Sequence, residues 1–219
     1  MIKYRERAAA AMPQLFCRKE QIIMEKVPNQ EQGHNNDDGA IVRVGRELKH
    51  RGAIVDFYSD EMEFPNGDHA HWDFIMHKGA AAIIPVLPDG RIVMVRQYRN
   101  APEQYTLEIP AGGLNPAEDK MTCAAREMEE ETGWKSAGEV RHLMDLYTTV
   151  AFCNEKIGIY YAEDLVPGEQ HLDQDEYLGI EIYTLPELVD LVMAGKIVDA
   201  KTIAAVLAYA ELVRRRDAG

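Results

Sequence analysis

The sequence predicts an α/β protein in which a mixed β-sheet lies between helices, preceded by a small antiparallel strand unit. Three observations support this class. After residue 40, short apolar runs are separated by turns rich in Pro, Asn, Asp and Gly. Helical periodicity appears at three separate places in the second half of the chain. Further strands alternate with these helices, which favours a sheet covered by helices.

The strand signals begin at residue 41. Apolar and polar residues nearly alternate up to residue 64, and a Pro-Asn-Gly-Asp turn at 65–68 follows directly. Residues 72–76 are therefore expected to return as the next strand of a small antiparallel unit. A Pro-Asp-Gly turn separates two further apolar runs, which predicts a hairpin of residues 80–87 and 91–98.

The second half of the chain alternates strands with helices. Further strands are predicted at residues 106–109, 138–150, 156–162 and 178–184. Helices are predicted at residues 186–194 and 199–215, and the second carries an apolar face. We divide the chain into three parts: an N-terminal extension and linker at residues 1–40, a strand unit at 41–76 and the main domain at 77–219.

The N-terminal extension gives ambiguous signals. Residues 4–12 could form a short basic helix, and residues 16–27 could form a second helix or a strand. Residues 29–39, NQEQGHNNDDG, are polar and typical of a linker. We assign no chemistry to this part of the chain.

The most informative stretch, residues 107–134, reads LEIPAGGLNPAEDKMTCAAREMEEETGW. Asn115, followed by Pro and then by Glu118, is typical of a helix start. Gly133 is a natural stop for the same helix. Four apolar residues recur at offsets of three and four and are expected to pack inward: Met121, Ala124, Ala125 and Met128.

Glu127, Glu130 and Glu131 lie on another face of that helix. Exposed carboxylates on adjacent turns repel one another by roughly a few tenths of a kcal/mol per pair. They also stand at the C-terminal end, where the helix dipole favours cations. A bound divalent ion would explain them, since oxygen ligands suit Mg²⁺ or Mn²⁺. Arg126 can hold the carboxylates through forked hydrogen bonds, with Glu118 as a candidate partner. The alternative is a solvated acidic helix face.

These residues resemble the signature of the Nudix hydrolases, Gly-x5-Glu-x7-Arg-Glu-U-x-Glu-Glu-x-Gly-U, in which U is a bulky apolar residue. Every fixed position is present from Gly112 onward, with Met128 and Trp134 as the bulky residues. The resemblance extends over roughly residues 50–215. It implies a Nudix-type α/β/α sandwich with a mixed central sheet and a metal-dependent hydrolase that cleaves a diphosphate bond.

The flanking segments resemble the ADP-ribose pyrophosphatase subfamily. The matching segments are RQYR at 96–99, LEIPAG at 107–112, FCNE at 152–155 and GKIVDAKT at 195–202. The resemblance implies cleavage of ADP-ribose into AMP and ribose 5-phosphate. One segment departs, because TTVAF at 148–152 stands where the subfamily has a Ser-Pro-Gly-like segment. Another nucleoside diphosphate sugar, an ADP- or GDP-sugar, is therefore the alternative substrate.

A third hypothesis is a Nudix-fold module that binds a ligand without turnover. Such modules usually lose carboxylates of the signature, whereas this chain retains them all. The complete signature therefore favours an enzyme over a binding module.

The resemblance also assigns roles to single residues. The Mg²⁺ or Mn²⁺ ligands are expected to be Glu127, Glu130, Glu131 and the backbone carbonyl of Ala111. Glu118 and Arg126 are expected to support them in the catalytic centre. The base that activates the attacking water is expected in an acidic turn, where Glu176 matches best by position and Asp173 and Asp175 are alternatives.

The substrate contacts are expected to come from other segments. Arg99 is the candidate contact for a phosphate, and Glu155 could assist. The candidates for an aromatic stack on the base are Trp72, Tyr58 and Phe57, although aromatic residues in strands often belong to the core. The resemblance implies a homodimer in which Arg51 or Trp72 serves the site of the partner subunit. His77, without an obvious partner, and Cys123 are interpreted as structural.

Composition limits the classes of partner and compartment. The chain has 219 residues and a formal net charge of −13, which argues against binding to nucleic acid. Its three cysteines are far apart and imply neither a disulfide framework nor a metal-ligand spacing. No apolar run approaches the roughly 18 residues of a membrane span, and we find no signal peptide. We therefore expect a cytoplasmic protein without a membrane partner.

Overall fold

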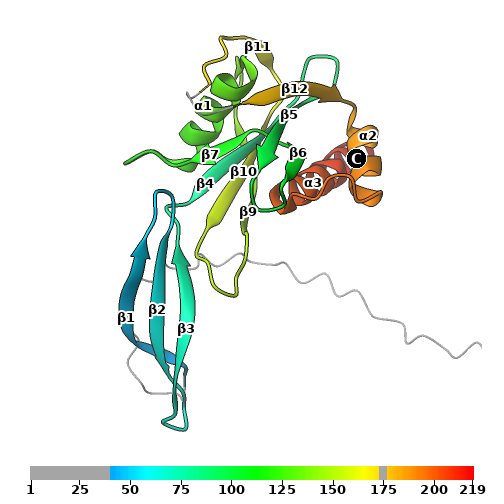
Figure 1. The fold of residues 1–219 in the computed structure, drawn as a ribbon. Coiled ribbons are helices and arrows are strands. Elements are labelled where there is room, and N and C mark those ends of the chain that lie inside the picture. Colours follow the sequence, from blue (N-terminus) through cyan, green and yellow to red (C-terminus); the bar gives the residue numbers. More distant parts are fainter. Residues whose placement is uncertain (1–39, 173–176) are drawn as a thin grey trace, which may run out of the picture. The chain divides into compact units, whose positions relative to one another are not determined.

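The structure is a computed structural model that describes residues 40–172 and 177–219 (Figure 1). Our expectations for the N-terminal extension and for the acidic turn at 173–176 lie outside the described residues. All described elements belong to one compact unit that spans Asn36–Gly219. Within the described ranges, no helix is long and apolar enough to cross a membrane.

Three antiparallel strands form the predicted N-terminal unit. They are β1 (Val42–Arg51), β2 (Asp56–Glu63) and β3 (His69–Met76), and they pair in the order β1-β2-β3. The guanidinium of Arg46 donates two hydrogen bonds of 2.6 Å to Asp60 and lies 3.9 Å from the ring centroid of Phe74. This buried ion pair and the stacked ring hold the centre of the sheet together.

The central sheet is mixed, as the sequence predicts. Its four strands have the order β7 (Ala111–Gly113), β4 (Ala80–Pro85), β10 (Lys156–Ala162) and β9 (Arg141–Tyr147). Strands β4 and β10 are parallel, whereas the other two pairs are antiparallel. Two shorter sheets complete the main domain: β12 (Leu178–Tyr183) with β5 (Ile92–Arg99) and β6 (Gln104–Glu108), and β11 (Leu165–Pro167) with β8 (Trp134–Ser136).

Helices cover both faces of this sheet (Figure 1). Ala81 and Ile83 of β4 belong to a core cluster with Ala124 and Met128 of α1 (Lys120–Thr132). Their neighbour Ile84 points the other way, into a cluster that includes residues of α2 (Leu185–Met193) and α3 (Ala200–Asp217). Because successive side chains of a strand face opposite sides, β4 is buried on both faces. The α/β/α sandwich expected from the sequence is confirmed.

The predicted hairpin of residues 80–87 and 91–98 is wrong in its pairing. The turn forms, with Gly90 donating to the Leu87 carbonyl at 2.8 Å, and Val86 and Ile92 form a single bridge. Beyond that bridge the strands separate, because β4 pairs with β7 and β10 whereas β5 pairs with β6 and β12. Each strand is apolar enough to be central in a sheet of its own, and a central strand needs two neighbours.

The helix of the signature starts later than predicted. Its N-cap is Asp119, whose carboxylate accepts hydrogen bonds from the amides of Met121 and Thr122. Asn115 instead begins a turn in which Ala117 has a φ of 63°. Met121 was expected to pack inward but is 49% exposed, and Cys123 takes its place in the core. Gly133 ends the helix in the left-handed conformation, as predicted.

Candidate active site

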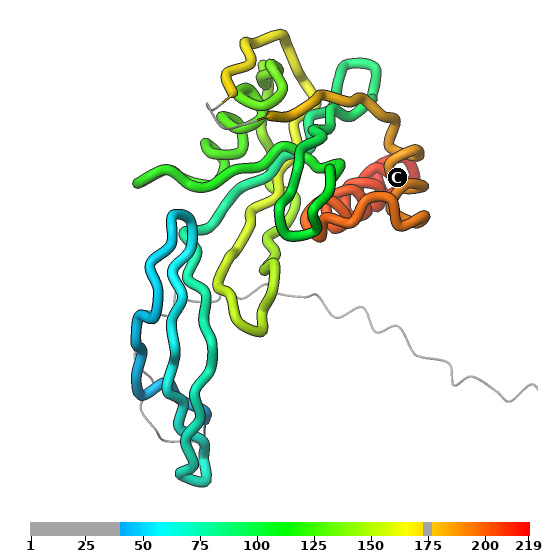
Figure 2. Tube along the Cα trace, viewed as in Figure 1, coloured from blue at the N-terminus to red at the C-terminus, as the bar shows by residue number. Residues whose placement is uncertain are grey.

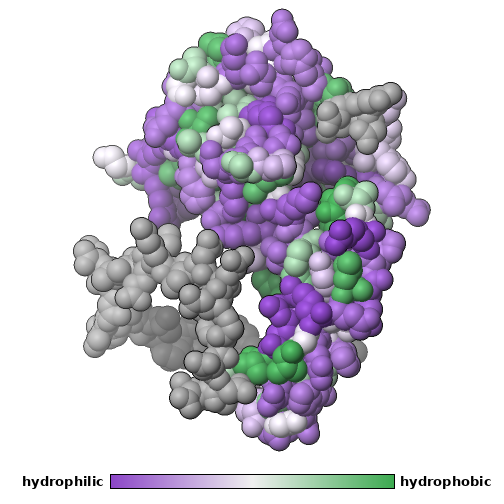
Figure 3. Space-filling model, turned by 90° about the vertical axis from the view of Figure 1, so that its left-hand side faces the viewer, coloured by the Kyte–Doolittle hydropathy of each residue, from purple (hydrophilic) through white to green (hydrophobic). Residues whose placement is uncertain are grey.

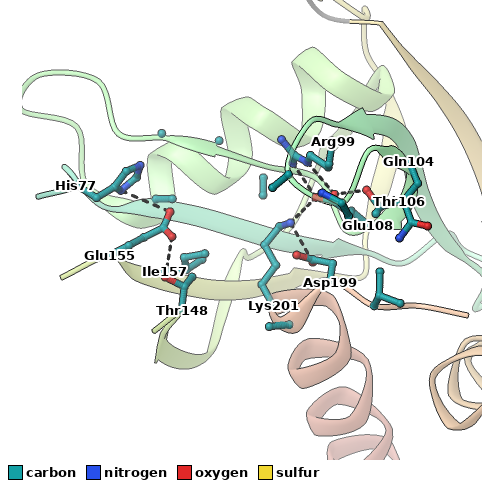
Figure 4. Close-up of a pocket in the computed structure, with 18 residues that line it drawn as sticks. His77, Arg99, Gln104, Thr106, Glu108, Thr148, Glu155, Ile157, Asp199 and Lys201 are labelled. Atoms are coloured by element: carbon teal, nitrogen blue, oxygen red, sulfur yellow. Dashed lines mark hydrogen bonds and ion pairs between the residues drawn. The ribbon is translucent and has the colours of Figure 1, made fainter. Parts of the chain in front are cut away.

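A cavity of about 670 Å³ opens beside the end of β4 (Figure 4). It is lined by β4, the segment from Arg99 to Glu108, the Gly loop at 111–113, the loop between β9 and β10 and the N-terminal end of α3. These segments lie far apart in the sequence, and the sheet brings them together. Pro102 and Ile157 give the cavity apolar walls between its charged groups.

Arg126 organises the carboxylates of α1. Its Nε and Nη2 donate to the two oxygens of Glu118, at 2.8 and 2.9 Å. Its Nη1 donates to Glu127 and to Glu130, both at 2.7 Å. The hydrogen bond from Arg126 lowers the pKa of Glu118 to about 2, and the same contact raises the pKa of Arg126. Arg126 thus holds three acidic side chains close together through its hydrogen bonds.

The Gly loop packs directly against these carboxylates. A Cβ atom on Gly112 would lie 2.0 Å from Oε1 of Glu127, so only glycine lets that side chain occupy its position. The amide of Ala111 donates to Oε2 of Glu131 at 3.1 Å. Glu127 and Glu131 are buried, with 7% and 2% of their surface exposed. The backbone of the loop and two acidic side chains therefore meet at one place.

This donor set fits a magnesium or manganese ion. Within the described ranges, no three acidic, His or Cys side chains form a preformed metal cage. Mg²⁺, however, usually binds one or two carboxylates and completes its shell with water and substrate phosphate, so a preformed cage is not required. The carboxylate oxygens of Glu127, Glu130 and Glu131, with the carbonyl of Ala111, have the hardness that such an ion prefers.

A second charged cluster, unlike the α1 carboxylates and Arg126, lines the cavity itself (Figure 4). Glu108 is 1% exposed and accepts hydrogen bonds from Arg99 at 2.8 and 2.7 Å, from Thr106 at 2.6 Å and from Lys201. Burial alone would raise the pKa of Glu108, but the hydrogen bonds from Arg99 and the charge of Lys201 outweigh it and lower the pKa to about 2. Lys201 also donates to Asp199 at 3.0 Å.

Sequence reasoning missed Glu108 and Lys201 as site residues. A signal was present for Glu108, because it is a single acid at the end of the apolar run before Pro110. Lys201 gave none by itself, since a lysine in the first turn of a helix is usually solvated. Lys201 is only 7% exposed in the folded protein, because α3 places it beside Glu108 of β6. Arg99, the candidate phosphate contact, lines the cavity, and its guanidinium is held in place by Glu108.

His77, Thr148 and Glu155 line the end of the cavity away from Lys201 (Figure 4). Thr148 donates to Glu155 at 2.8 Å. Our view of His77 as a residue without an obvious partner is wrong. Its Nδ1 accepts from the amide of Gly79 at 3.0 Å and lies 3.5 Å from Glu155, because the turn after β3 folds back against the loop before β10.

Several predicted residues lie away from the cavity or outside the described ranges. Arg51 and Trp72 are on the N-terminal sheet and do not line the cavity, and neither do Phe57 and Tyr58. Among the described lining residues, the only aromatic ring is the imidazole of His77. The candidate base Glu176 and its alternatives lie outside the described residues. Cys123 is buried, and burial raises the pKa of its thiol to about 12, which agrees with a packing role.

Comparisons with known proteins agree with this geometry. Residues 76–206 match the NUDIX domain. The chain is 34% identical over 165 residues to an ADP-ribose pyrophosphatase of Bacillus subtilis, covering 74% of this chain and 89% of the relative. It is 35% identical over 170 residues to an ADP-ribose pyrophosphatase of Mycobacterium tuberculosis, covering 75% and 81%. It is also 37% identical over 157 residues to a methanol dehydrogenase activator of Bacillus methanolicus, covering 71% and 84%.

A solved structure described as an ADP compounds hydrolase shares the fold. It superposes with a TM-score of 0.72 at 23% identity, covering 80% of this chain and 95% of that one. At this identity the match establishes the architecture alone.

Proposed function

Because this chain belongs to the Nudix family of hydrolases, which act on phosphorus-containing anhydrides, we propose that it hydrolyses ADP-ribose to AMP and ribose 5-phosphate. One observation carries the proposal. The buried carboxylates of Glu127 and Glu131 meet the Gly loop beside a cavity that also contains the cationic side chain of Arg99. Such an arrangement suits a diphosphate whose charge is shared between metal and arginine.

Glu127, Glu130, Glu131 and the carbonyl of Ala111 would hold the divalent ion, which we propose to be Mg²⁺ or Mn²⁺. When bound, such an ion neutralises phosphate oxygens and lowers the pKa of a coordinated water. Arg126 holds the carboxylates of Glu127 and Glu130 at a fixed separation, so that they need little reorganisation when substrate enters.

Arg99 is proposed to bind a phosphate group of the substrate. Its bidentate pairing with Glu108 fixes the plane of the guanidinium, and its side chain is still 43% exposed. Glu155 is proposed to accept hydrogen bonds from sugar hydroxyls, since its carboxylate lines the cavity beside Thr148. The proposed base is Glu176, with Asp173 and Asp175 as alternatives.

Among the described residues, the cavity offers no aromatic side chain besides His77 to stack on the nucleobase. We propose a homodimer in which Trp72 or Arg51 of one protomer completes the site of the other. The N-terminal sheet supports this idea, because Val44, Leu48 and Trp72 on it are 39–48% exposed. Figure 3 shows apolar residues in green among hydrophilic ones in the lower part of the molecule, where this sheet lies. We propose that this enzyme works in the cytoplasm, without a nucleic acid or membrane partner.

The alternative substrate is another ADP- or GDP-sugar. The loop that departs from the subfamily pattern, residues 148–152, contributes Thr148 to the cavity wall near Glu155. A change of sugar would therefore be accommodated at this wall, while the carboxylates of α1 and the cleavage chemistry stay the same.

A substrate panel tests the proposal. Purified full-length protein is incubated with ADP-ribose, an ADP-hexose, a GDP-hexose, a dinucleoside diphosphate and ATP, each with Mg²⁺, Mn²⁺ or a chelator, and the products are separated by chromatography. We expect the highest kcat/KM for ADP-ribose, with AMP and ribose 5-phosphate as products and no cleavage with chelator. Faster cleavage of a hexose derivative would favour the alternative. Failure to cleave any diphosphate would overturn both.

The metal ligands are tested by comparing two glutamates of α1. Glu131→Gln should lower kcat by more than the roughly 10–100-fold that loss of an outer-shell residue costs, because a carboxamide is a poor ligand for a hard cation. Glu129→Gln is the matched control, since Glu129 lies on the same helix but pairs only distantly with Lys135, at 4.0 Å. Steady-state rates measure the effect, and circular dichroism checks the fold. Equal rates in the two variants would contradict the assignment.

A further inference from the structure

We infer that the first turn of α3 positions the Gly loop through Lys201 and Thr202 and thereby sets the affinity for the divalent ion. The inference rests on the proposed function, because it assumes that the carbonyl of Ala111 and the carboxylates of α1 bind metal. It adds positioning residues that lie about 90 positions further along the chain, on a helix that contributes none of the proposed ligands.

Thr202 makes the first of two contacts between α3 and the loop. The amide of Ile109 donates to Oγ1 of Thr202 at 3.0 Å, and Thr202 is fully buried. Two residues later, the amide of Ala111 donates to Glu131 on α1. The residue between them, Pro110, has no amide hydrogen, and its carbonyl accepts from Ile83 of β4 at 3.0 Å. The backbone before the Gly pair is therefore hydrogen-bonded to α1, to α3 and to β4.

Lys201 makes the second contact. Its ammonium group donates to Glu108, the residue that precedes Ile109, and to Asp199, the N-cap of α3. Asp199 in turn accepts from the amide of Thr202 at 3.0 Å and from its hydroxyl. The cap of the helix and the anchor of the loop are thus one hydrogen-bonded unit, so that a shift of either moves the other.

The consequence for metal binding follows from the short distance along the loop. Ile109 is two residues from the proposed carbonyl ligand of Ala111, and Glu131 bonds the amide of that same residue. A buried amide that loses its acceptor tends to move toward another partner, because an unsatisfied buried donor is destabilising. Such movement would misplace the Ala111 carbonyl, and loss of outer-shell contacts typically weakens metal affinity by about 10–100-fold.

The test is a Mn²⁺ titration of the full-length protein without substrate, followed by electron paramagnetic resonance of the free ion. Thr202→Val keeps the side-chain shape but removes the acceptor, and Lys201→Met removes the ammonium group while Arg99 still compensates Glu108. We expect each variant to raise the Kd for Mn²⁺ by about tenfold or more. Thr202→Ser and Lys201→Arg should restore most of the affinity.

The matched control is Thr184→Val. Thr184 caps helix α2 through its side chain, and its side-chain hydrogen bonds are to Glu187 of that helix. It should lower the melting temperature to a similar extent and leave the Kd for Mn²⁺ unchanged. Equal weakening in this control would show general destabilisation and overturn the inference. So would wild-type affinity in both Thr202→Val and Lys201→Met. If Thr202→Val does not fold, the Lys201 pair decides the question.

The same titration separates this inference from the proposed function. A wild-type protein that binds no Mn²⁺ and cleaves no diphosphate would contradict the proposed function itself. A wild-type protein that binds Mn²⁺ and cleaves substrate, with variants that bind the ion as tightly, would contradict only the positioning role of α3.

Discussion

At the scale of single residues, Gly112 and Gly113 occupy adjacent positions but meet different surroundings. A Cβ on Gly112 would overlap the carboxylate of Glu127, whereas nothing lies within 4 Å of the corresponding point on Gly113. The overlapping atoms are the far end of a flexible side chain, which can turn away at low cost. The requirement for glycine at position 112 therefore concerns the position of Glu127 more than the stability of the fold.

This difference gives a direct prediction. Gly112→Ala should lower kcat/KM by roughly tenfold or more, because it displaces the proposed ligand Glu127, while the melting temperature changes little. Gly113→Ala should keep both activity and stability. Steady-state kinetics and differential scanning fluorimetry measure the two effects. An active Gly112→Ala variant would show that Glu127 can move without consequence.

Glu108 predicts a pH dependence of stability. Its pKa is lowered from 4.5 to about 2 in the folded protein. A carboxyl with a depressed pKa contributes stability that is complete above its unfolded pKa and is lost as the pH falls toward the folded pKa. The contribution of Glu108 should therefore be lost between pH 4.5 and about 2.

Urea unfolding of wild type and Glu108→Gln at several pH values checks this. The difference in the free energy of unfolding should be largest at and above pH 4.5 and should shrink as the pH falls toward 2. Other acids titrate in both proteins and cancel in the difference. A difference that stays constant over this window would mean that Glu108 is not the group responsible.

At the scale of elements, two residues near the start of α1 are acceptable N-caps, and the structure uses one of them. Asn115 and Asp119 both have side chains that favour an N-cap, and Pro116 after Asn115 fits a first helical turn. In the structure the N-cap is Asp119. A helix cannot start at Asn115, because Ala117 has a left-handed backbone conformation. Glu118 is then free of the helix interior and reaches Arg126 with both oxygens.

Stability measurements can distinguish the two caps. Asp119→Ala should lower the free energy of unfolding by about 1 kcal/mol, because the amides of Met121 and Thr122 lose their acceptor. Asn115→Ala should cost less, since the bond recorded for Asn115 with Glu118 uses its backbone amide. Chemical denaturation of both variants gives the comparison, and the reverse order would contradict the observed helix start.

At the scale of the whole molecule, the N-terminal sheet is connected to a loop of the candidate site. The amide of Ile75 in β3 donates to the carbonyl of Phe152 at 2.7 Å, and Asn154 donates back to Ile75 at 3.3 Å. Figure 2 shows the yellow-green loop between β9 and β10 beside the cyan strand β3. Strand β3, which carries Trp72, is thus hydrogen-bonded through Ile75 to the loop that carries Glu155 in the cavity wall.

If a second protomer completes each site, two inactive variants should complement one another. Trp72→Ala retains the carboxylates but loses the proposed stacking ring, whereas Glu131→Gln retains the ring but loses a proposed ligand. A mixed dimer has one site with both groups intact. Co-refolded mixtures should therefore show activity that neither variant shows alone, measured as AMP release. Activity no greater than the sum of the separate variants would argue that each chain works with its own residues.

Features that depend on local spacing could be predicted before the fold was known. The stop of the signature helix at Gly133 and the contact of Arg126 with Glu130 follow from helical spacing, and the three-stranded N-terminal unit follows from alternation of apolar and polar residues, because local geometry converts such spacing into contacts. The mixed sheet between helices could also be predicted, because its apolar runs have lengths and turns that few architectures satisfy.

Which distant segments meet became visible only in the folded chain. The fold separated β4 from β5, buried Lys201 beside Glu108 and brought Thr202 to the amide of Ile109. No local pattern encodes these contacts, since burial of a lysine or a shared strand partner depends on what the rest of the chain places there. The α1 carboxylates were therefore visible in the sequence, whereas the contacts of α3 with the loop beside them were not.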